Sequence, residues 1–512
     1  MNIYSGTLVS VKLQLFRQFG FQLIAMIAVL TSCSGDTKKE VHLKPNILLI
    51  CVDDLRPELS CFDSRLIQTP NIDRLASEAR VFRRHYVQAA ICGPSRSSML
   101  SGQRINSWDC WKEARKYKIE TERPVSFAQL FHRFGYRTIC IGKVSHQPGG
   151  VMDEEQTLHE VPFSWDEAYT PVGQWETPWR TFFAYSESKA YNKAISMKKD
   201  ESRLPYEAAD VDDNGYPDGL IATAAIQQLQ KLASSDQPFL LATGFYKPHL
   251  PFNAPKKYWD LIDREKIPLV ENYRAPKNVD SAISIHNSYE LTMHYHWPGG
   301  PGNISETEAQ TLRHAYLACV RYADAQIGRV LDELRRLKLE DRTIVVLWSD
   351  HGYHLGEHGM FCKDTNYEIA TRSPLIVRLP GMVKRGESTD AIVESIDLYP
   401  TLAELCGLEP PEDLQGKSFV ELLDDPLAQG KEFAYSFHGR DKRMCNTVRT
   451  DRWRLIEWRE ADGRIIQTEL YDHAVDPDEN INVARYPDNR EVVERLQEIL
   501  NSVHYSKFLK LE

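Results

Sequence analysis

The sequence predicts an α/β fold with a mainly parallel central sheet flanked by helices. Short apolar runs rich in β-branched residues recur along the chain, and stretches with helix-like patterning separate them. This alternation is typical of parallel strands joined by crossover helices. The chain has 512 residues, of which 42% are hydrophobic and 26% charged, so it can bury a large core.

Five apolar runs are expected to form strands of this sheet: residues 46–52, 138–141, 239–243, 343–348 and 375–379. Their short length and their β-branched and aromatic residues favour extended structure. Residues 313–337 instead carry apolar side chains at helical spacing, which predicts a helix packed on the core.

Polar side chains follow four of these runs, at the points where the strands should end. They are Asp53 and Asp54, Lys143 and His146, Lys247 and His249, and Asp350 and His351. In open parallel sheets, ligands bind beyond the carboxyl ends of the strands. Four sets of side chains that can act as acids, bases or metal ligands at one edge of the sheet predict a functional site there.

The pattern changes beyond about Asp425, where short amphipathic strands precede a helix over residues 490–500. We therefore expect a catalytic domain over residues 44–424 and a smaller C-terminal α+β subdomain over residues 425–512. The subdomain should contain a short antiparallel sheet.

The first 33 residues are interpreted as a lipoprotein signal peptide. Lys12 and Arg17 precede an apolar run over residues 19–30, which is too short for a comfortable transmembrane helix. The run ends in Leu30-Thr31-Ser32-Cys33, which resembles the bacterial lipobox, in which Cys33 would carry the lipid. An ordinary cleaved signal is the alternative. We expect export, a polar tether over residues 34–43, and lipid anchoring to the bacterial cell envelope, at its periplasmic face or at the cell surface.

The formal net charge of −10 argues against nucleic acid as a partner, so an anionic substrate would need a local basic pocket. Ten cysteines are present. Cys51 and Cys140 lie in strand-like runs and are expected to be buried thiols. Pairing stays open among Cys61, Cys110, Cys319, Cys362, Cys406 and Cys445.

The segment Cys92-Gly93-Pro94-Ser95-Arg96 is the most specific motif. Pro94 suits the first turn of a helix, so Cys92 would lie at the helix N-terminus, where an anion is favoured. Here the sequence resembles the sulfatase family, whose motif Cys-x-Pro-Ser-Arg directs oxidation of the cysteine to formylglycine. Further landmarks resemble its iduronate-2-sulfatase branch: Asp53-Asp54-Leu55-Arg56-Pro57, Gly142-Lys143-Val144-Ser145-His146, Tyr246-Lys247-Pro248-His249, Ser349-Asp350-His351-Gly352 and Glu469-Leu470-Tyr471-Asp472.

The resemblance implies an alkaline-phosphatase-like fold and a divalent metal ion. Calcium is the first choice and magnesium the second, because most of the implied ligands are oxygens. It also implies a formylglycine-generating maturation enzyme as a partner. By the same resemblance the metal ligands are Asp53, Asp54, Asp350, His351 and the modified Cys92.

The resemblance further assigns a mechanism. The metal, Lys143 and Lys363 would neutralise the sulfate oxygens, while Arg96 would hold the formylglycine hydrate whose hydroxyl attacks sulfur. His249 would protonate the departing sugar oxygen, and His146 would take a proton from the second hydroxyl.

The implied substrate is a 2-O-sulfated uronic acid in a glycosaminoglycan-type oligosaccharide. Algal sulfated polysaccharides are an alternative, as is the chemistry of phosphonate monoester hydrolases and phosphodiesterases in the same superfamily. A lipid-anchored carbohydrate-binding protein without catalysis, or one whose Cys92 stays a thiol, also remains open. Two sets of residues would either contact the sugar or serve packing and solvation: the aromatic residues Trp165, Tyr169, Trp175 and Trp179, and the basic residues Arg440, Lys442, Arg443, Arg449, Arg452 and Arg454.

Overall fold

The computed structural model describes residues 44–64, 66–105, 109–187, 203–296 and 304–503. The expected signal peptide with Cys33 and the expected tether lie outside the described residues. Among the described helices, none combines the length and the apolar character that a membrane crossing needs.

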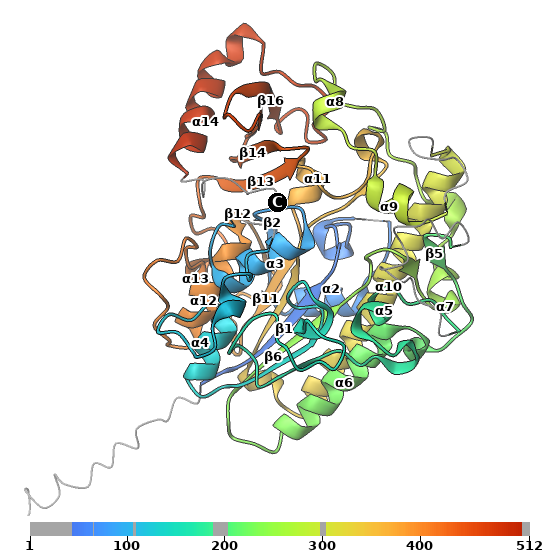
Figure 1. The fold of residues 1–512 in the computed structure, drawn as a ribbon, viewed down its shortest axis with the longest axis vertical. Coiled ribbons are helices and arrows are strands. Elements are labelled where there is room, and N and C mark those ends of the chain that lie inside the picture. Colours follow the sequence, from blue (N-terminus) through green and yellow to red (C-terminus); the bar gives the residue numbers. More distant parts are fainter. Residues whose placement is uncertain (1–43, 65, 106–108, 188–202, 297–303, 504–512) are drawn as a thin grey trace, which may run out of the picture. The chain divides into compact units, whose positions relative to one another are not determined.

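An eight-stranded sheet forms the centre of the fold (Figure 1), with the strand order β12-β2-β11-β8-β1-β6-β3-β4. Its strands are β1 (Asn46–Val52), β2 (Arg80–Tyr86), β3 (Arg137–Gly142), β4 (Glu167–Tyr169), β6 (Phe239–Phe245), β8 (Thr343–Ser349), β11 (Leu375–Arg378) and β12 (Ser388–Glu394). Neighbouring strands run parallel except for β11, which is antiparallel to both β2 and β8. The predicted mainly parallel sheet is therefore confirmed, and all five expected runs are strands.

The register of the three central strands brings their carboxyl ends to one level. Val52 of β1 pairs with Phe245 of β6 on one side and with Ser349 of β8 on the other. The residues that follow these three positions therefore leave the sheet at the same edge. This alignment places the strand-end aspartates beside one another.

Helices cover both faces of the sheet. One face carries α2 (Pro70–Ala76), α6 (Pro217–Leu232) and α10 (Glu306–Arg336), and the other carries α3 (Cys92–Ser101), α4 (Phe127–Arg133), α12 (Leu398–Leu405) and α13 (Val420–Asp424). Successive side chains of β1 enter the two cores in turn, as strand geometry requires. Every residue of β1 is buried, which explains its unbroken apolar sequence.

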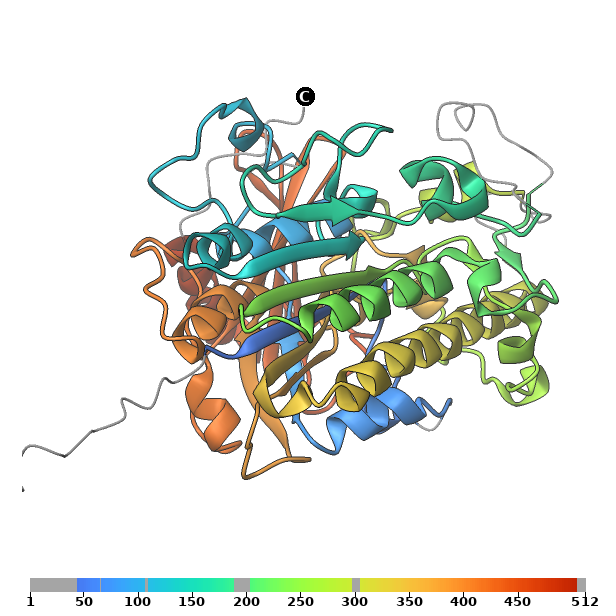
Figure 2. The same ribbon diagram turned by 90° about the horizontal axis from the view of Figure 1, so that it is seen from below.

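The long helix α10 is the helix that the apolar spacing predicted. Ser305 caps it, because its hydroxyl accepts from the Glu308 N–H while the Glu308 carboxylate accepts from the Ser305 N–H. Figure 2 shows α10 and α6 side by side along the strands. Shorter elements complete the part of the chain before residue 425: α5 (Pro178–Phe182), α7 (Lys256–Trp259), α8 (Ser281–Ser284), α9 (Tyr289–His294), α11 (Glu368–Thr371), β5 (Tyr206–Glu207), β7 (Phe252–Asn253), β9 (His354–Leu355) and β10 (Phe361–Cys362).

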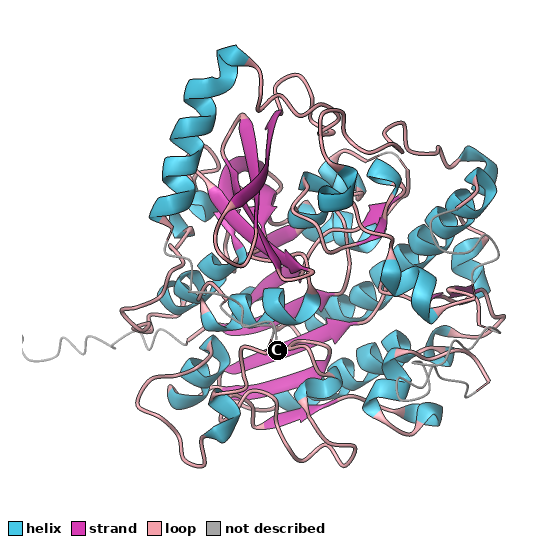
Figure 3. Ribbon diagram, turned by 45° about the horizontal axis from the view of Figure 1, so that its top comes forward, coloured by secondary structure: helices cyan, strands magenta, loops and turns pink. Residues whose placement is uncertain are grey.

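A second sheet lies in the C-terminal part, as predicted (Figure 3). Its four antiparallel strands are β13 (Ala434–Arg440), β14 (Arg443–Arg449), β15 (Trp453–Arg459) and β16 (Ile465–Asp472), and α14 (Arg490–Ser502) packs on it. Strand β13 also contacts the segment that leads to Cys92, because the Phe437 N–H donates to the Gln88 carbonyl at 2.8 Å. The C-terminal sheet thus supports the segment before the motif. The exact boundary at residue 425 stays a prediction.

All nine cysteines in the described ranges are free thiols. None of the pairings that the sequence left open therefore forms there. Cys51 and Cys140 are fully buried, as expected for strand residues.

Candidate active site

The strand-end aspartates form the floor of the candidate site. Asp53 and Asp54 follow β1, Asp350 and His351 follow β8, and all four are completely buried. The Asp54 N–H donates to the Asp350 carboxylate at 3.0 Å, which ties the two strand ends together. Asp54 has a φ of 61°, a left-handed conformation that costs free energy in a non-glycine residue and is often found at functional sites.

Cys92 is the first residue of α3, as the position of Pro94 predicted. Its Sγ lies 3.3 Å from Nε2 of His351 and 3.9 Å from Oδ1 of Asp54. The structure thus brings the motif cysteine to both strand ends.

Arg96 lies one turn after Cys92 and is fully buried. Its Nε is 2.8 Å from the Asp350 carboxylate, and its Nη2 is 3.0 Å from that of Asp53. Its Nη1 donates to the carbonyls of Lys143 and Val144. One guanidinium therefore links α3 to the ends of β1, β8 and β3. A lysine could not make these contacts, because its ammonium is a single point charge, whereas the planar guanidinium carries several donors in a fixed geometry.

Two buried lysines contact the strand-end aspartates. Lys143 forms an ion pair with Asp53, and Lys363 lies 3.0 Å from Oδ2 of Asp54. Burial would lower the pKa of the Lys363 ammonium, yet the anionic groups around it, Asp54 first, raise that pKa well above its usual value. Lys363 is therefore placed to act as a permanent cation.

The two candidate histidines contact different parts of the site. His146 packs against the motif backbone, since a Cβ built on Gly93 would lie only 3.3 Å from its Cγ. His249 follows β6, and its Nε2 lies 3.9 Å from Asp54. Residue 93 therefore needs to be small for His146 to lie beside Cys92.

Glu290 is the site residue that sequence reasoning missed. It belongs to α9, and its carboxylate lies 3.0 Å from both Nε2 of His249 and Nζ of Lys363. Burial would raise the pKa of Glu290, but Lys363 and His249 hold it well below its usual value. Glu290 follows no predicted strand and belongs to no family landmark, so no sequence signal singled it out.

The donor set fits a hard divalent cation. One ligand atom from each of Asp53, Asp54, Cys92 and His351 can be chosen so that all lie within 4.8 Å of one another. Asp350, the fifth predicted ligand, has its Oδ2 3.7 Å from Nε2 of His351. The carboxylate oxygens suit calcium or magnesium. The three aspartates already face the three cations Arg96, Lys143 and Lys363, so a divalent ion would add positive charge to the site.

Burial and charge perturb the ionisation of the central groups. Burial would raise the pKa of the Asp53 carboxyl, but Lys143 and Arg96 hold it well below its usual range. Burial and then the charge of Asp53 raise the pKa of the Cys92 thiol well above its ordinary value. An unmodified Cys92 is therefore a poor nucleophile at neutral pH.

Several other residues named from the sequence have structural roles. Lys247 donates to the carbonyls of His249 and Pro251. Four of the six basic C-terminal residues form ion pairs, Arg449 with Glu368, Arg454 with Glu479, Arg452 with Asp472 and Arg443 with Glu460.

The aromatic residues named from the sequence lie before, in and after β4 and in α5, and they mostly pack against their neighbours. Trp175 is fully buried, and Trp165 is buried as well. Trp179 stacks on Phe183 and lies edge-on to His146, with 6.0 Å between the ring centroids in each case. Trp179 therefore adjoins the candidate site residue His146 through a ring contact.

Sequence comparison finds matches over most of the chain. The family model described as Sulfatase matches residues 45–408, and the model described as N-sulphoglucosamine sulphohydrolase, C-terminal, matches residues 356–506. Iduronate 2-sulfatase from Mus musculus is 32% identical over 448 residues, which cover 80% of this chain and 77% of the relative. A sulfatase from Formosa agariphila is 32% identical over 481 residues, which cover 92% of this chain and 89% of that protein.

Solved structures share the fold at lower identity. A protein in complex with its substrate D-glucosamine-2-N,6-O-disulfate matches with a TM-score of 0.69 and 22% identity, covering 91% of this chain and 98% of that one. The phosphonate monoester hydrolase of Agrobacterium radiobacter matches with a TM-score of 0.71 and 22% identity, covering 90% and 95%. At these identities the likeness concerns the fold.

Proposed function

The chain belongs to the sulfatase family and is a sulfuric ester hydrolase, and on that premise we propose that it removes sulfate from sugars with a nucleophile made from Cys92. One observation carries the proposal. Cys92 lies within 4 Å of both Asp54 and His351, two of the predicted metal ligands, inside a buried group of aspartates and cations. This arrangement suits a reacting group held against a bound anion.

The residues of the site can meet the two chemical requirements of sulfate ester hydrolysis. The oxygens around sulfur repel a nucleophile, and the leaving alkoxide is poor, so the enzyme must supply positive charge and a proton. The aspartates and the cations Arg96, Lys143 and Lys363 balance one another in charge. A divalent ion held by Asp53, Asp54, Asp350 and His351 would leave the site with net positive charge, and the hydrate of formylglycine at position 92 would supply the attacking hydroxyl.

The chain's own residues have distinct tasks in this proposal. Arg96 holds the end of α3 against Asp53 and Asp350, which keeps residue 92 in place. Lys143 and Lys363 bind sulfate oxygens. His249 would donate a proton to the departing sugar oxygen as the sulfate passes to residue 92. His146, beside Gly93, would then take a proton from the second hydroxyl, so that collapse to the aldehyde breaks the bond between its carbon and the sulfate oxygen and releases sulfate.

We propose a 2-O-sulfated uronic acid in glycosaminoglycan-type oligosaccharides as the substrate. Support comes from the relative named iduronate 2-sulfatase, which shares 32% identity over most of both chains. The alternative of algal sulfated polysaccharides concerns the same chemistry on another sugar. The fold neighbour named as a phosphonate monoester hydrolase is 22% identical, and at that identity the likeness supports a shared fold and not a shared activity.

Export and lipid attachment at Cys33 complete the proposal. They rest on the lipobox-like ending Leu30-Thr31-Ser32-Cys33. Metabolic labelling of bacterial cells with a radioactive fatty acid should label the wild-type chain and leave Cys33→Ala unlabelled. Labelling of that variant would refute the anchor.

Mass spectrometry of the peptide containing residue 92, combined with a substrate screen, tests the enzymatic proposal. We expect the mass of formylglycine in place of cysteine in protein made with a maturation enzyme, and release of sulfate from a 2-O-sulfated uronate disaccharide. Turnover of phosphonate esters without any turnover of sulfate esters would contradict the proposal. Release of sulfate only from algal oligosaccharides would replace the proposed sugar and keep the enzyme class.

A further inference from the structure

Asp364 carries a buried carboxyl group that no other described residue satisfies. The residue is only 7% exposed, yet its side-chain oxygens form neither a hydrogen bond nor an ion pair with any residue that the structure describes. Most buried polar side chains do have a partner, because taking a carboxyl group out of water without one is costly. The Asp364 carboxyl is therefore free to accept a hydrogen bond from a bound molecule.

Backbone contacts hold Asp364 beside the motif cysteine. Its N–H donates to the carbonyl of Ala90 at 3.1 Å, and Ala90 lies two residues before Cys92. Its φ of 69° lies in the left-handed region, which aspartate enters more readily than most residues. The preceding residue, Lys363, contacts Asp54 at 3.0 Å. Asp364 is thus tied both to the segment that carries the proposed nucleophile and to a lysine of the site.

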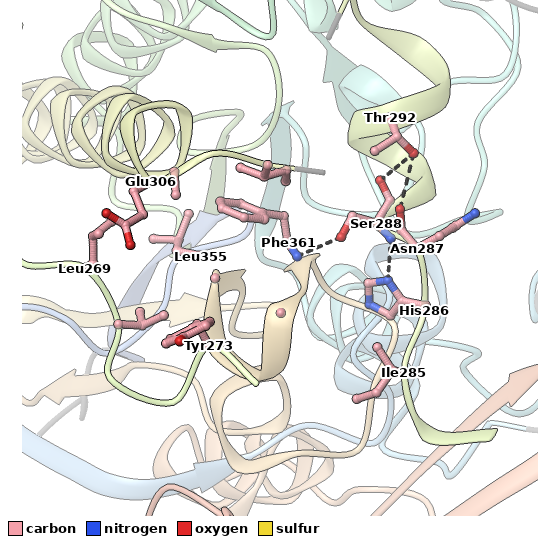
Figure 4. A pocket seen from close by; sticks show the side chains of 15 residues that line it. Leu269, Tyr273, Ile285, His286, Asn287, Ser288, Thr292, Glu306, Leu355 and Phe361 are labelled. Atoms are coloured by element: carbon pink, nitrogen blue, oxygen red, sulfur yellow. Dashed lines mark hydrogen bonds between the residues drawn. The ribbon is translucent and has the colours of Figure 1, made fainter. Parts of the chain in front are cut away.

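Contacts with the segment before α9 fix the chain that leads to Asp364. The Phe361 N–H donates to the hydroxyl of Ser288 at 2.8 Å, and Nε2 of His286 donates to the Lys363 carbonyl at 2.6 Å. Figure 4 shows His286 and Ser288 beside Phe361, at the wall of a cavity of about 640 Å³. Because this segment is held by hydrogen bonds, the carboxyl of Asp364 is pre-organised, which lowers the entropic cost of binding a ligand.

Charged groups of the site act on the Asp364 carboxyl. Burial first, and then the charge of Glu290, raise its pKa to about 7, while Lys363 and His351 act in the opposite direction. Asp364 is in turn the largest cause of the raised pKa of the Tyr289 phenol, and Tyr289 is 45% exposed. The carboxyl therefore interacts both with buried groups of the site and with a side chain that reaches solvent.

These charges favour a neutral hydrogen-bond donor as the ligand of Asp364. An anionic group would be repelled by Asp364 and Glu290, and a cationic group would be repelled by Lys363. A hydroxyl avoids both penalties. A carboxyl group can accept a hydrogen bond from it in either protonation state.

We propose that Asp364 is a specificity-determining residue, which accepts a hydrogen bond from the sugar hydroxyl adjacent to the sulfate ester. This proposal rests on the proposed function, because it needs a sulfated sugar in the site. Lys363 would bind a sulfate oxygen, so a carboxyl on the next residue would meet the part of the ring next to the ester. In a 2-O-sulfated uronate at the non-reducing end of a disaccharide, C1 forms the glycosidic bond, and the adjacent hydroxyl is therefore the one on C3.

Two substrates that differ in this hydroxyl test the proposal. They are the 2-O-sulfated uronate disaccharide and its 3-deoxy analogue, assayed with metal-loaded protein made with a maturation enzyme. For wild type we expect kcat/KM to be about 10- to 100-fold higher for the disaccharide than for the analogue, because the analogue leaves the buried carboxyl without a partner. The ratio of the two kcat/KM values is the readout, since a general loss of activity cancels in it.

Three variants complete the experiment. Asp364→Gly removes the carboxyl and suits the left-handed backbone, so the ratio should fall below about threefold. Asp364→Asn should give an intermediate ratio, because its amide oxygen still accepts a hydrogen bond but carries no charge. Asp63→Gly is the matched control and should keep the wild-type ratio, since Asp63 has a φ of 68° and a side chain that is 76% exposed.

Several outcomes would overturn the inference. Equal kcat/KM values of wild type on the two substrates would show that the hydroxyl is not recognised. A wild-type ratio in Asp364→Gly, even with lower activity, would assign recognition to another residue and leave Asp364 a structural role. If that variant does not fold, an unchanged ratio in Asp364→Asn would count equally, because asparagine tolerates the same backbone.

Failure of the proposed function gives a different result. Wild type that hydrolysed no sulfate ester at all would refute the function. Hydrolysis of 4-nitrophenyl sulfate without hydrolysis of the disaccharide would refute the proposed sugar, and the inference with it. Cleavage of the disaccharide without regard to the C3 hydroxyl would refute the inference alone.

Discussion

The Sγ atom of Cys92 lies 3.3 Å from Nε2 of His351, although 259 residues separate them in the chain. Cys92 begins a helix, and His351 follows a central strand of the sheet. Their contact depends on Arg96, which joins that helix to Asp350. The proposed nucleophile position and the proposed metal-ligand positions are therefore parts of one buried ion-pair network.

Replacing Cys92 by alanine should abolish sulfate ester hydrolysis. The variant cannot form formylglycine, and removing one sulfur atom from a buried site should cost only about 1–2 kcal/mol of unfolding free energy. Activity assays and chemical denaturation measure the two effects. Cys406→Ala, which also removes a buried thiol, is the matched control and should keep its activity. Residual turnover in Cys92→Ala would show that another residue attacks sulfur.

His249→Ala should affect substrates according to their leaving groups. General acid catalysis contributes about 10²- to 10⁴-fold, so turnover of a sugar sulfate should fall within that range. Turnover of 4-nitrophenyl sulfate should fall far less, because its phenolate leaves without a proton. Steady-state kinetics on both substrates measure the difference. A variant that spared the sugar sulfate relative to the aryl sulfate would rule out His249 as the acid.

Chelation should remove activity, and calcium should restore it together with stability. A ligand that binds only the folded state stabilises it by about 2.7 kcal/mol at a concentration of 100 Kd. The unfolding midpoint of chelator-treated protein should therefore rise as calcium is titrated, and magnesium provides the comparison. Asp54→Asn should lose most of this response, since it removes a charged oxygen ligand. An unchanged midpoint with every divalent ion tested would contradict the metal site.

Acid should destabilise the wild-type protein partly through Glu357. Burial would raise the pKa of this carboxyl, but Arg56 and Arg313 lower it from 4.5 to about 2. Because the folded state holds the charged form, this contribution is fully present above pH 4.5 and is lost as the pH falls toward 2. The shift corresponds to about 3 kcal/mol.

Denaturation curves at pH 6 and pH 3 check this prediction. Glu357→Gln should be less stable at pH 6, because Arg56 would lose the carboxylate at 2.9 Å, but it should lose less stability than wild type on acidification. Glu265→Gln, at an exposed position, should follow wild type. The same acid loss in Glu357→Gln would assign the effect to other groups.

Local patterns of apolar residues in the sequence predicted a large part of the fold. The strands β1, β6 and β8 were recognisable because strands buried on both faces need continuous apolar runs. Strand β2 was missed because its sequence, Arg80 to Tyr86, contains three arginines and a histidine. Its Arg80 is buried only because the guanidinium donates to the carbonyls of Leu422 and Leu423, which lie far along the chain.

The residues of the candidate site likewise include some that the sequence predicted and some that it did not. Asp53, Asp54, Asp350 and His351 were predictable because each follows a strand, and Cys92 and Arg96 because they share a motif. Glu290 was not predictable, because its relation to His249 arises from contacts between α9 and β10. The basic residues Arg449 and Arg454 were open to two interpretations until their carboxylate partners were known.

The sequence by itself determined the α/β class, the strands that end at the site, the family resemblance and the residue types available for catalysis. These follow from local periodicity and from short motifs, which depend on neighbouring residues. The tertiary structure alone decided which charges meet, which basic residues are neutralised and that Glu290 bridges His249 and Lys363. Such pairings depend on distances between segments that are remote in the chain, and these distances are set by how the sheet, the helices and the loops pack together.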